Sequence, residues 1–107
     1  MSETLVYMTC GSTEEAEKIG RALVEKRLAA CINMFDGMRS LYWWEGKVEQ
    51  GSEVVLLAKT TANLVEELTE EVKRLHEYDV PCVVTLPITG GNTDFLRWIH
   101  EETQSEG

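Results

Sequence analysis

Apolar positions near the start of the chain change from an alternating pattern to helical spacing. Residues 5–8, Leu-Val-Tyr-Met, alternate weakly, which is typical of a strand. From Ala16 onward, apolar residues recur at helical spacing, and Ser12 with Glu15 three positions later matches a capping box. The pattern therefore predicts a strand over residues 5–8 and a helix over about residues 13–26.

The next part of the chain predicts a long β-hairpin. Residues 28–35 form a short apolar run suited to a strand, and Asp36-Gly37 interrupts it. The strand resumes over residues 40–44, turns at Glu45-Gly46, and returns over residues 47–60. The returning strand is apolar on both faces at its centre, so we expect it to lie inside the sheet.

Three aromatic residues precede the hairpin turn: Tyr42, Trp43 and Trp44. Neighbouring side chains of a strand point to opposite faces, so one small core cannot take both tryptophans from the same side. Large exposed apolar patches usually mark an interface. We expect these three residues to contact other copies of the chain.

The second half of the chain predicts two helices and a further strand. An apolar stripe at helical spacing predicts a helix over residues 62–76, with its acidic residues on the solvated face. The run over residues 80–88 is a strand bracketed by prolines, and Asn92 is placed to cap a short last helix. We expect residues 103–107 to form a frayed tail.

The predicted order is β-α-β-β-α-β followed by a helix. This order favours an α+β fold, the ferredoxin-like split βαβ arrangement, with a long extended hairpin and an extra C-terminal helix. At 107 residues the chain fits one domain, spanning residues 1–107. Two helices cover only one face of such a sheet, and other copies of the chain are the simplest cover for the second face.

Composition excludes several partners. The formal net charge is −9, and the ten Lys and Arg residues form no stripe, so we expect no nucleic-acid binding. The longest apolar run, residues 54–58, is too short to cross a bilayer, and residues 1–10 carry no basic leader. We therefore expect no membrane association and a cytoplasmic location.

Several separated blocks of the sequence resemble the CutA family, named for divalent-cation tolerance. The blocks are EKRLAACINM, SLYWWEGKVEQ, LLAKT, LHEYDVPCVVTLPI and GNTDFLRWI, and the similarity runs from about Val6 to Glu101. The resemblance implies a ferredoxin-like subunit in a homotrimer whose long hairpin pairs with neighbouring subunits. It also implies a role in tolerance to copper and other divalent metals. The alternative is a trimeric signalling or scaffold module that responds to a small ligand, as PII-like proteins do.

The resemblance also implies a partial copper site. Some family members use a Cys near the end of the first strand and two adjacent His residues. The matching positions here are Met8, Leu75 and His76, so only His76 is retained. Cys10 shares a strand face with Met8, and Met, Cys and His together suit Cu(I). We expect any metal site to be weak, to prefer Cu(I), and to use His76 with Met8 or Cys10.

Lys59 and Tyr78 are candidate ligand-binding residues. Lys59 follows the most apolar strand, and a lysine is rarely buried without a partner. It either binds a small anionic ligand between subunits together with Tyr78, or forms a salt bridge with a carboxylate such as that of Glu53 or Asp79.

Nothing in the sequence predicts catalysis. The common nucleophile, metalloprotease and phosphate-loop motifs are absent. The Gly11-Ser12 loop resembles an anion-binding loop in outline, but it carries no arginine. We expect the protein not to be an enzyme.

Overall fold

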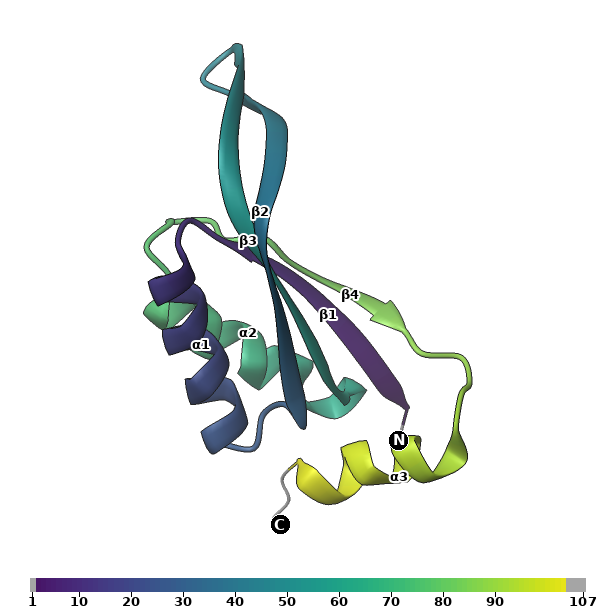
Figure 1. The fold of residues 1–107 in the computed structure, drawn as a ribbon. Coiled ribbons are helices and arrows are strands. Elements are labelled where there is room, and N and C mark those ends of the chain that lie inside the picture. Colours follow the sequence, from purple (N-terminus) through teal and green to yellow (C-terminus); the bar gives the residue numbers. More distant parts are fainter. Residues whose placement is uncertain (1, 104–107) are drawn as a thin grey trace.

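The computed structural model describes residues 2–103 and shows four strands and three α-helices (Figure 1). All neighbouring strands are antiparallel, in the order β2-β3-β1-β4. The elements are β1 Glu3–Cys10, α1 Thr13–Glu25, β2 Cys31–Trp44, β3 Lys47–Thr61, the 3₁₀ turn Ala62–Leu64, α2 Val65–Leu75, β4 Val83–Pro87 and α3 Thr93–Glu102. The expected order of strands and helices is confirmed.

Helices α1 and α2 cover one face of the sheet, and the core lies between them (Figure 1). In β1, Val6, Met8 and Cys10 alternate toward this core, which matches the strand period of two. Gly20 of α1 permits a close approach, because a Cβ there would lie 3.2 Å from Ile32 Cγ2. None of the helices in residues 2–103 is long and apolar enough to cross a membrane.

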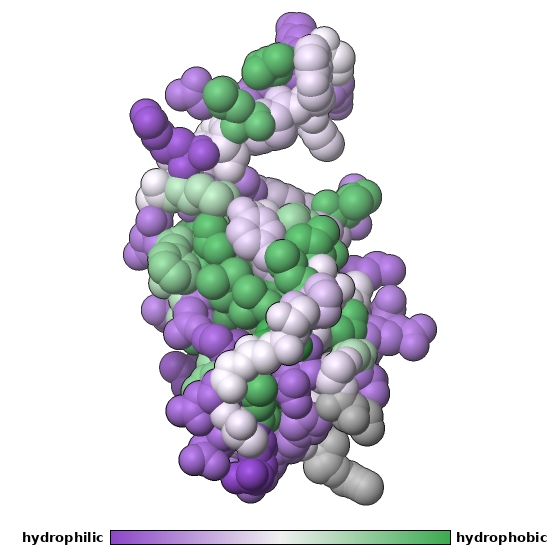
Figure 2. Space-filling view, turned by 90° about the vertical axis from the view of Figure 1, so that its right-hand side faces the viewer, coloured by the Kyte–Doolittle hydropathy of each residue, from purple (hydrophilic) through white to green (hydrophobic). Residues whose placement is uncertain are grey.

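Within residues 2–103, no helix covers the opposite face of the sheet (Figure 1). Leu56 of β3 points into the core, so its neighbour Leu57 points to the uncovered face. Residues that pair directly across a ladder point to the same face, so the pairing of the strands identifies the other residues on this side. Figure 2 shows hydrophobic side chains gathered over the middle of this face. Those assigned to it by register are Leu5, Tyr7, Phe35, Val55, Leu57, Val84 and Leu86. An apolar surface of this extent is typical of an interface.

Strands β2 and β3 continue beyond the sheet as a long hairpin (Figure 1). Glu45 and Gly46 both have positive φ, 50° and 79°, which is the pattern of a type I′ turn. Asp36-Gly37 forms an irregularity inside β2 and does not end the strand. Trp43 and Trp44 lie on opposite faces of the hairpin and are 75% and 60% exposed.

Element boundaries differ from the expectation at strand ends. β1 extends to Glu3 and Cys10, because its outer residues pair with β3 along the whole length. β4 begins only at Val83, since Pro81 has no N–H to donate to a ladder and Val80 is exposed. Thr103, expected in the frayed tail, is buried and its hydroxyl donates to the Ile99 carbonyl. The other tail residues, 104–107, lie outside the described residues.

Candidate functional site

Three buried side chains that can bind a metal ion meet beside the end of β1. Cys10 is the last residue of β1, Glu15 lies in the first turn of α1, and His76 caps the end of α2. One ligand atom from each lies within 4.8 Å of the other two. Their exposed fractions are only 1%, 6% and 9%. Cys10 and His76 were predicted to be site residues, and the structure brings them together.

Glu15 was missed as a site residue. Its backbone N–H donates to the Ser12 hydroxyl over 3.1 Å, as a capping box requires. Its carboxylate, however, accepts from the backbone N–H groups of Gly11 at 3.1 Å and Glu77 at 2.7 Å. The signal was present in the sequence, because Glu15 precedes Ile19 by four residues and therefore lies on the buried stripe of the helix.

The hydrogen bonds of His76 define which ring nitrogen can bind a metal. Nε2 lies 2.8 Å from the Thr9 carbonyl oxygen, which can only accept, so Nε2 carries a proton. Nδ1 accepts the backbone N–H of Tyr78 at 3.0 Å and lies 3.3 Å from Glu15 Oε2. The ring nitrogen without a proton is therefore Nδ1, which lies on the side of Glu15 and is the one that could bind a metal ion.

Cys10 is held as a neutral thiol. Burial raises its pKa to about 12, and the nearby carboxylates of Glu15, Glu53 and Glu77 add to the increase. A metal ion must therefore displace a proton from Cys10 at neutral pH, and this requirement lowers the apparent affinity.

The donor set fits a metal ion of intermediate softness. Two ligand atoms about 2.0 Å from a tetrahedral ion lie about 3.3 Å apart. The 3.3 Å separation between His76 Nδ1 and Glu15 Oε2 already matches this geometry. A thiolate and an imidazole suit zinc and copper, whereas a carboxylate favours a divalent ion over Cu(I).

Met8 lies in the hydrophobic core, two residues before Cys10 on the same face of β1. It pairs in the ladder with Leu56 and Val83, both apolar. Leu75 packs partly buried against the same core. Met8 thus has apolar neighbours in the sheet, and its role as a ligand stays a prediction.

Lys59 and Tyr78 are not brought together within one chain. Tyr78 lies over the cluster, with its ring 4.7 Å from that of His76. Lys59 lies six residues beyond Glu53 on β3, about 20 Å along the strand. It forms no ion pair among the described residues, so the expected salt bridge to Glu53 or Asp79 is wrong. Its ammonium instead donates to Asn33 Oδ1 at 2.5 Å.

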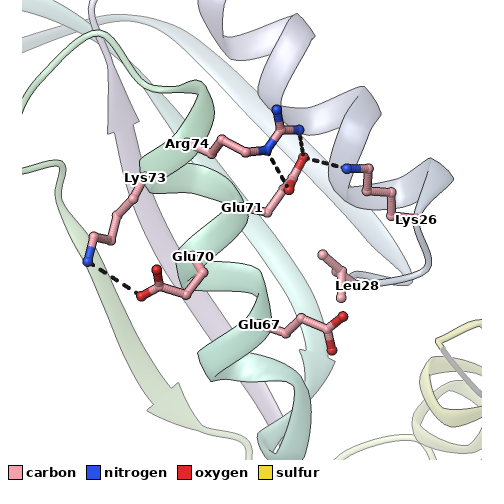
Figure 3. A pocket seen from close by; sticks show the side chains of 7 residues that line it. All are labelled: Lys26, Leu28, Glu67, Glu70, Glu71, Lys73 and Arg74. Atoms are coloured by element: carbon pink, nitrogen blue, oxygen red, sulfur yellow. Dashed lines mark hydrogen bonds and ion pairs between the residues drawn. The ribbon is translucent and has the colours of Figure 1, made fainter.

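A surface hollow of about 590 Å³ lies between the end of α1 and the outer side of α2 (Figure 3). Glu71 bonds to Arg74 at 2.6 Å and to Lys26 at 2.9 Å, and these partners lower the pKa of Glu71 to about 2. Lys73 is similarly paired with Glu70. The hollow is lined by three cations and, with Glu67, by three carboxylates, so it has no excess of positive charge and is a poor site for an anion.

Comparison with known proteins identifies related sequences along nearly the whole chain. Residues 4–102 match the family model described as "CutA1 divalent ion tolerance protein". A divalent-cation tolerance protein CutA from Thermus thermophilus is 48% identical over 101 residues, which cover 94% of this chain and 98% of the relative. A crystal structure of CutA1 from Oryza sativa superposes with a TM-score of 0.96 at 42% identity, covering 99% of this chain and 97% of that one.

Some relatives are longer. Protein CutA from Mus musculus is 44% identical over 104 residues, which is 97% of this chain. The match spans only 59% of the mouse protein. The similarity to the mouse protein therefore concerns only the region that it shares with this chain.

Proposed function

The chain belongs to the CutA1 divalent ion tolerance family, and we propose that it acts in metal tolerance by binding a metal ion weakly at Cys10, Glu15 and His76. The observation that carries this proposal is the meeting of three buried donors within 4.8 Å. A cluster in which burial and the charge of Glu15 raise the pKa of a thiol is a candidate functional site.

Copper is one of the proposed ions, and two alternative sets of donor residues would prefer different ions. Cys10 and His76 with the thioether of Met8 would form a soft site that prefers Cu(I). The same two residues with Glu15 would form a site suited to Zn²⁺ or Cu²⁺. Substitution of Met8 or Glu15 therefore distinguishes the two sets.

We further propose a homotrimer of ferredoxin-like subunits. The strand order and the pair of helices on one face support the ferredoxin-like assignment. The uncovered apolar face and the exposed Tyr42, Trp43 and Trp44 support assembly. A cytoplasmic location is part of the proposal, and three free cysteines agree with a reducing compartment.

Metal handling is preferred to ligand sensing by a PII-like module. A small-anion cleft would need Lys59 of one copy to lie beside Tyr78 of another, because one chain keeps them apart. The metal cluster needs no second chain, since all three donors come from residues 10–76. Neither catalysis nor nucleic-acid binding enters the proposal.

Loss of a cluster ligand is expected to weaken metal binding by about tenfold or more. Competition titrations with zinc and with Cu(I) under reducing conditions would compare the wild type with His76→Ala, Cys10→Ser, Glu15→Gln and Met8→Leu. Glu15→Gln should mainly reduce zinc affinity, and Met8→Leu mainly Cu(I) affinity. Cys31→Ser and His100→Ala are matched controls, because neither residue belongs to the cluster. Equal affinities in the wild type, His76→Ala and Cys10→Ser would refute the proposed site.

A further inference from the structure

The metal-binding atom of His76 is already occupied by the chain itself. Neutral imidazole has one free lone pair, on Nδ1 in this structure, and it accepts the Tyr78 backbone N–H at 3.0 Å. A metal ion coordinated there would have to replace that hydrogen bond. The alternative nitrogen, Nε2, is equally engaged, since it donates to the buried Thr9.

Glu15 differs from His76 in this respect. Each carboxylate oxygen has two lone pairs, so Oε2 can bind a metal ion and still accept the Glu77 N–H. A bound metal ion therefore competes with only one backbone group for a lone pair, the N–H of Tyr78. Glu77 stays anchored to Glu15, while the N–H of the next residue, Tyr78, loses its acceptor.

Tyr78 connects the cluster to the base of the hairpin. Its ring lies 4.7 Å from that of His76, tilted by 49°, and its hydroxyl lies 3.3 Å from where a Cβ on Gly11 would be. Gly11 follows Cys10, which pairs with Val54 at the end of β1, so Glu53 is the first residue of β3 beyond that pairing. Glu53 on β3 accepts from Ser40 on β2 at 2.7 Å, where the two strands leave the sheet.

We infer that metal binding at His76 releases the Tyr78 N–H and shifts residues 78–80 away from the base of the hairpin. The inference rests on the proposed metal site and adds a conformational response to it. An ion that binds at Nδ1 favours the released state, because only in that state is the lone pair free. The response would reach the hairpin, the part of the chain with the most exposed aromatic residues.

The test is amide hydrogen exchange of the full chain, measured by NMR with and without saturating zinc. The Tyr78 amide should exchange about tenfold faster or more with zinc, as expected for loss of one hydrogen bond. The Glu77 amide and the Leu56 amide in the sheet should change much less. Unchanged protection of Tyr78, in protein that a competition titration shows to bind zinc through His76, would overturn the inference and leave the proposed function intact.

A metal-free variant tests the same contact independently. His76→Phe keeps an aromatic ring under Tyr78 but removes the lone pair. Without zinc, its Tyr78 amide should exchange as fast as that of the zinc-loaded wild type, and zinc should not change this rate. The control His100→Phe should resemble the wild type. If the Tyr78 amide of His76→Phe is as protected as in the wild type, the inference is overturned, whether or not the wild type binds zinc. If the wild type does not bind zinc, the proposed function is overturned.

Discussion

Trp44→Glu is expected to reduce the mass of the protein in dilute solution from three chains to one. Trp44 is 60% exposed in a single chain, so the fold of that chain depends little on it. In the proposed trimer the same side chain is covered by a neighbouring subunit. A carboxylate there would be buried without a partner, and symmetry repeats this cost at three interfaces.

Light scattering at micromolar concentration measures this directly. The wild type should give three times the single-chain mass of 12.1 kDa, and Trp44→Glu should give 12.1 kDa. Lys18→Glu is the matched control, because it adds negative charge on the exposed side of α1, away from the sheet face. A wild-type protein that is monomeric, or a Trp44→Glu variant that remains trimeric, would contradict the assembly.

Glu15→Ala is expected to lower the free energy of unfolding by about 3 kcal/mol. The carboxylate accepts from Gly11 at 3.1 Å and from Glu77 at 2.7 Å, and both N–H groups would lose their acceptor. Such unpaired donors are costly when they are shielded from water. Glu15→Gln should lose less, because one acceptor oxygen remains.

Urea unfolding at one fixed protein concentration provides the comparison, since assembly makes stability depend on concentration. Glu14→Ala is the matched control on the same helical turn, because Glu14 is exposed. Its free energy of unfolding should stay within about 0.5 kcal/mol of the wild type. A loss below about 1 kcal/mol in Glu15→Ala would show that Glu15 does not hold the Gly11 and Glu77 segments together.

The periodic parts of the fold could be predicted because one face of each element is buried. The stripe of α1 around Ile19 corresponds to buried positions. In β3, Leu56 faces the buried core, whereas its apolar neighbours Val55 and Leu57 lie on the uncovered face. Strand ends could not be predicted, because they depend on neighbours in the ladder. Thr9 pairs with Val55 on the adjacent strand, a contact that no local propensity at Thr9 encodes.

The candidate site was predictable only in part. Cys10 and His76 were found from residue chemistry and from family resemblance, but their approach across 66 positions depends on how α2 ends beside β1. Glu15 was assigned to a capping box, a local motif, although its carboxylate bonds to residues on either side of the cluster. Lys59 and Tyr78 lie apart because Lys59 pairs with Leu5 near one end of β1, whereas Tyr78 follows α2 and lies beside His76 at the other end, and sequence spacing does not reveal this placement.

X-ray absorption of the zinc-loaded protein tests the metal site most directly. One zinc per chain at Cys10, Glu15 and His76 should show one sulfur at about 2.3 Å together with nitrogen and oxygen ligands at about 2.0–2.2 Å. The sulfur contribution should disappear in Cys10→Ser and persist in Cys31→Ser. A zinc ion surrounded only by nitrogen and oxygen in the wild type, or an unchanged sulfur contribution in Cys10→Ser, would contradict metal binding at this cluster.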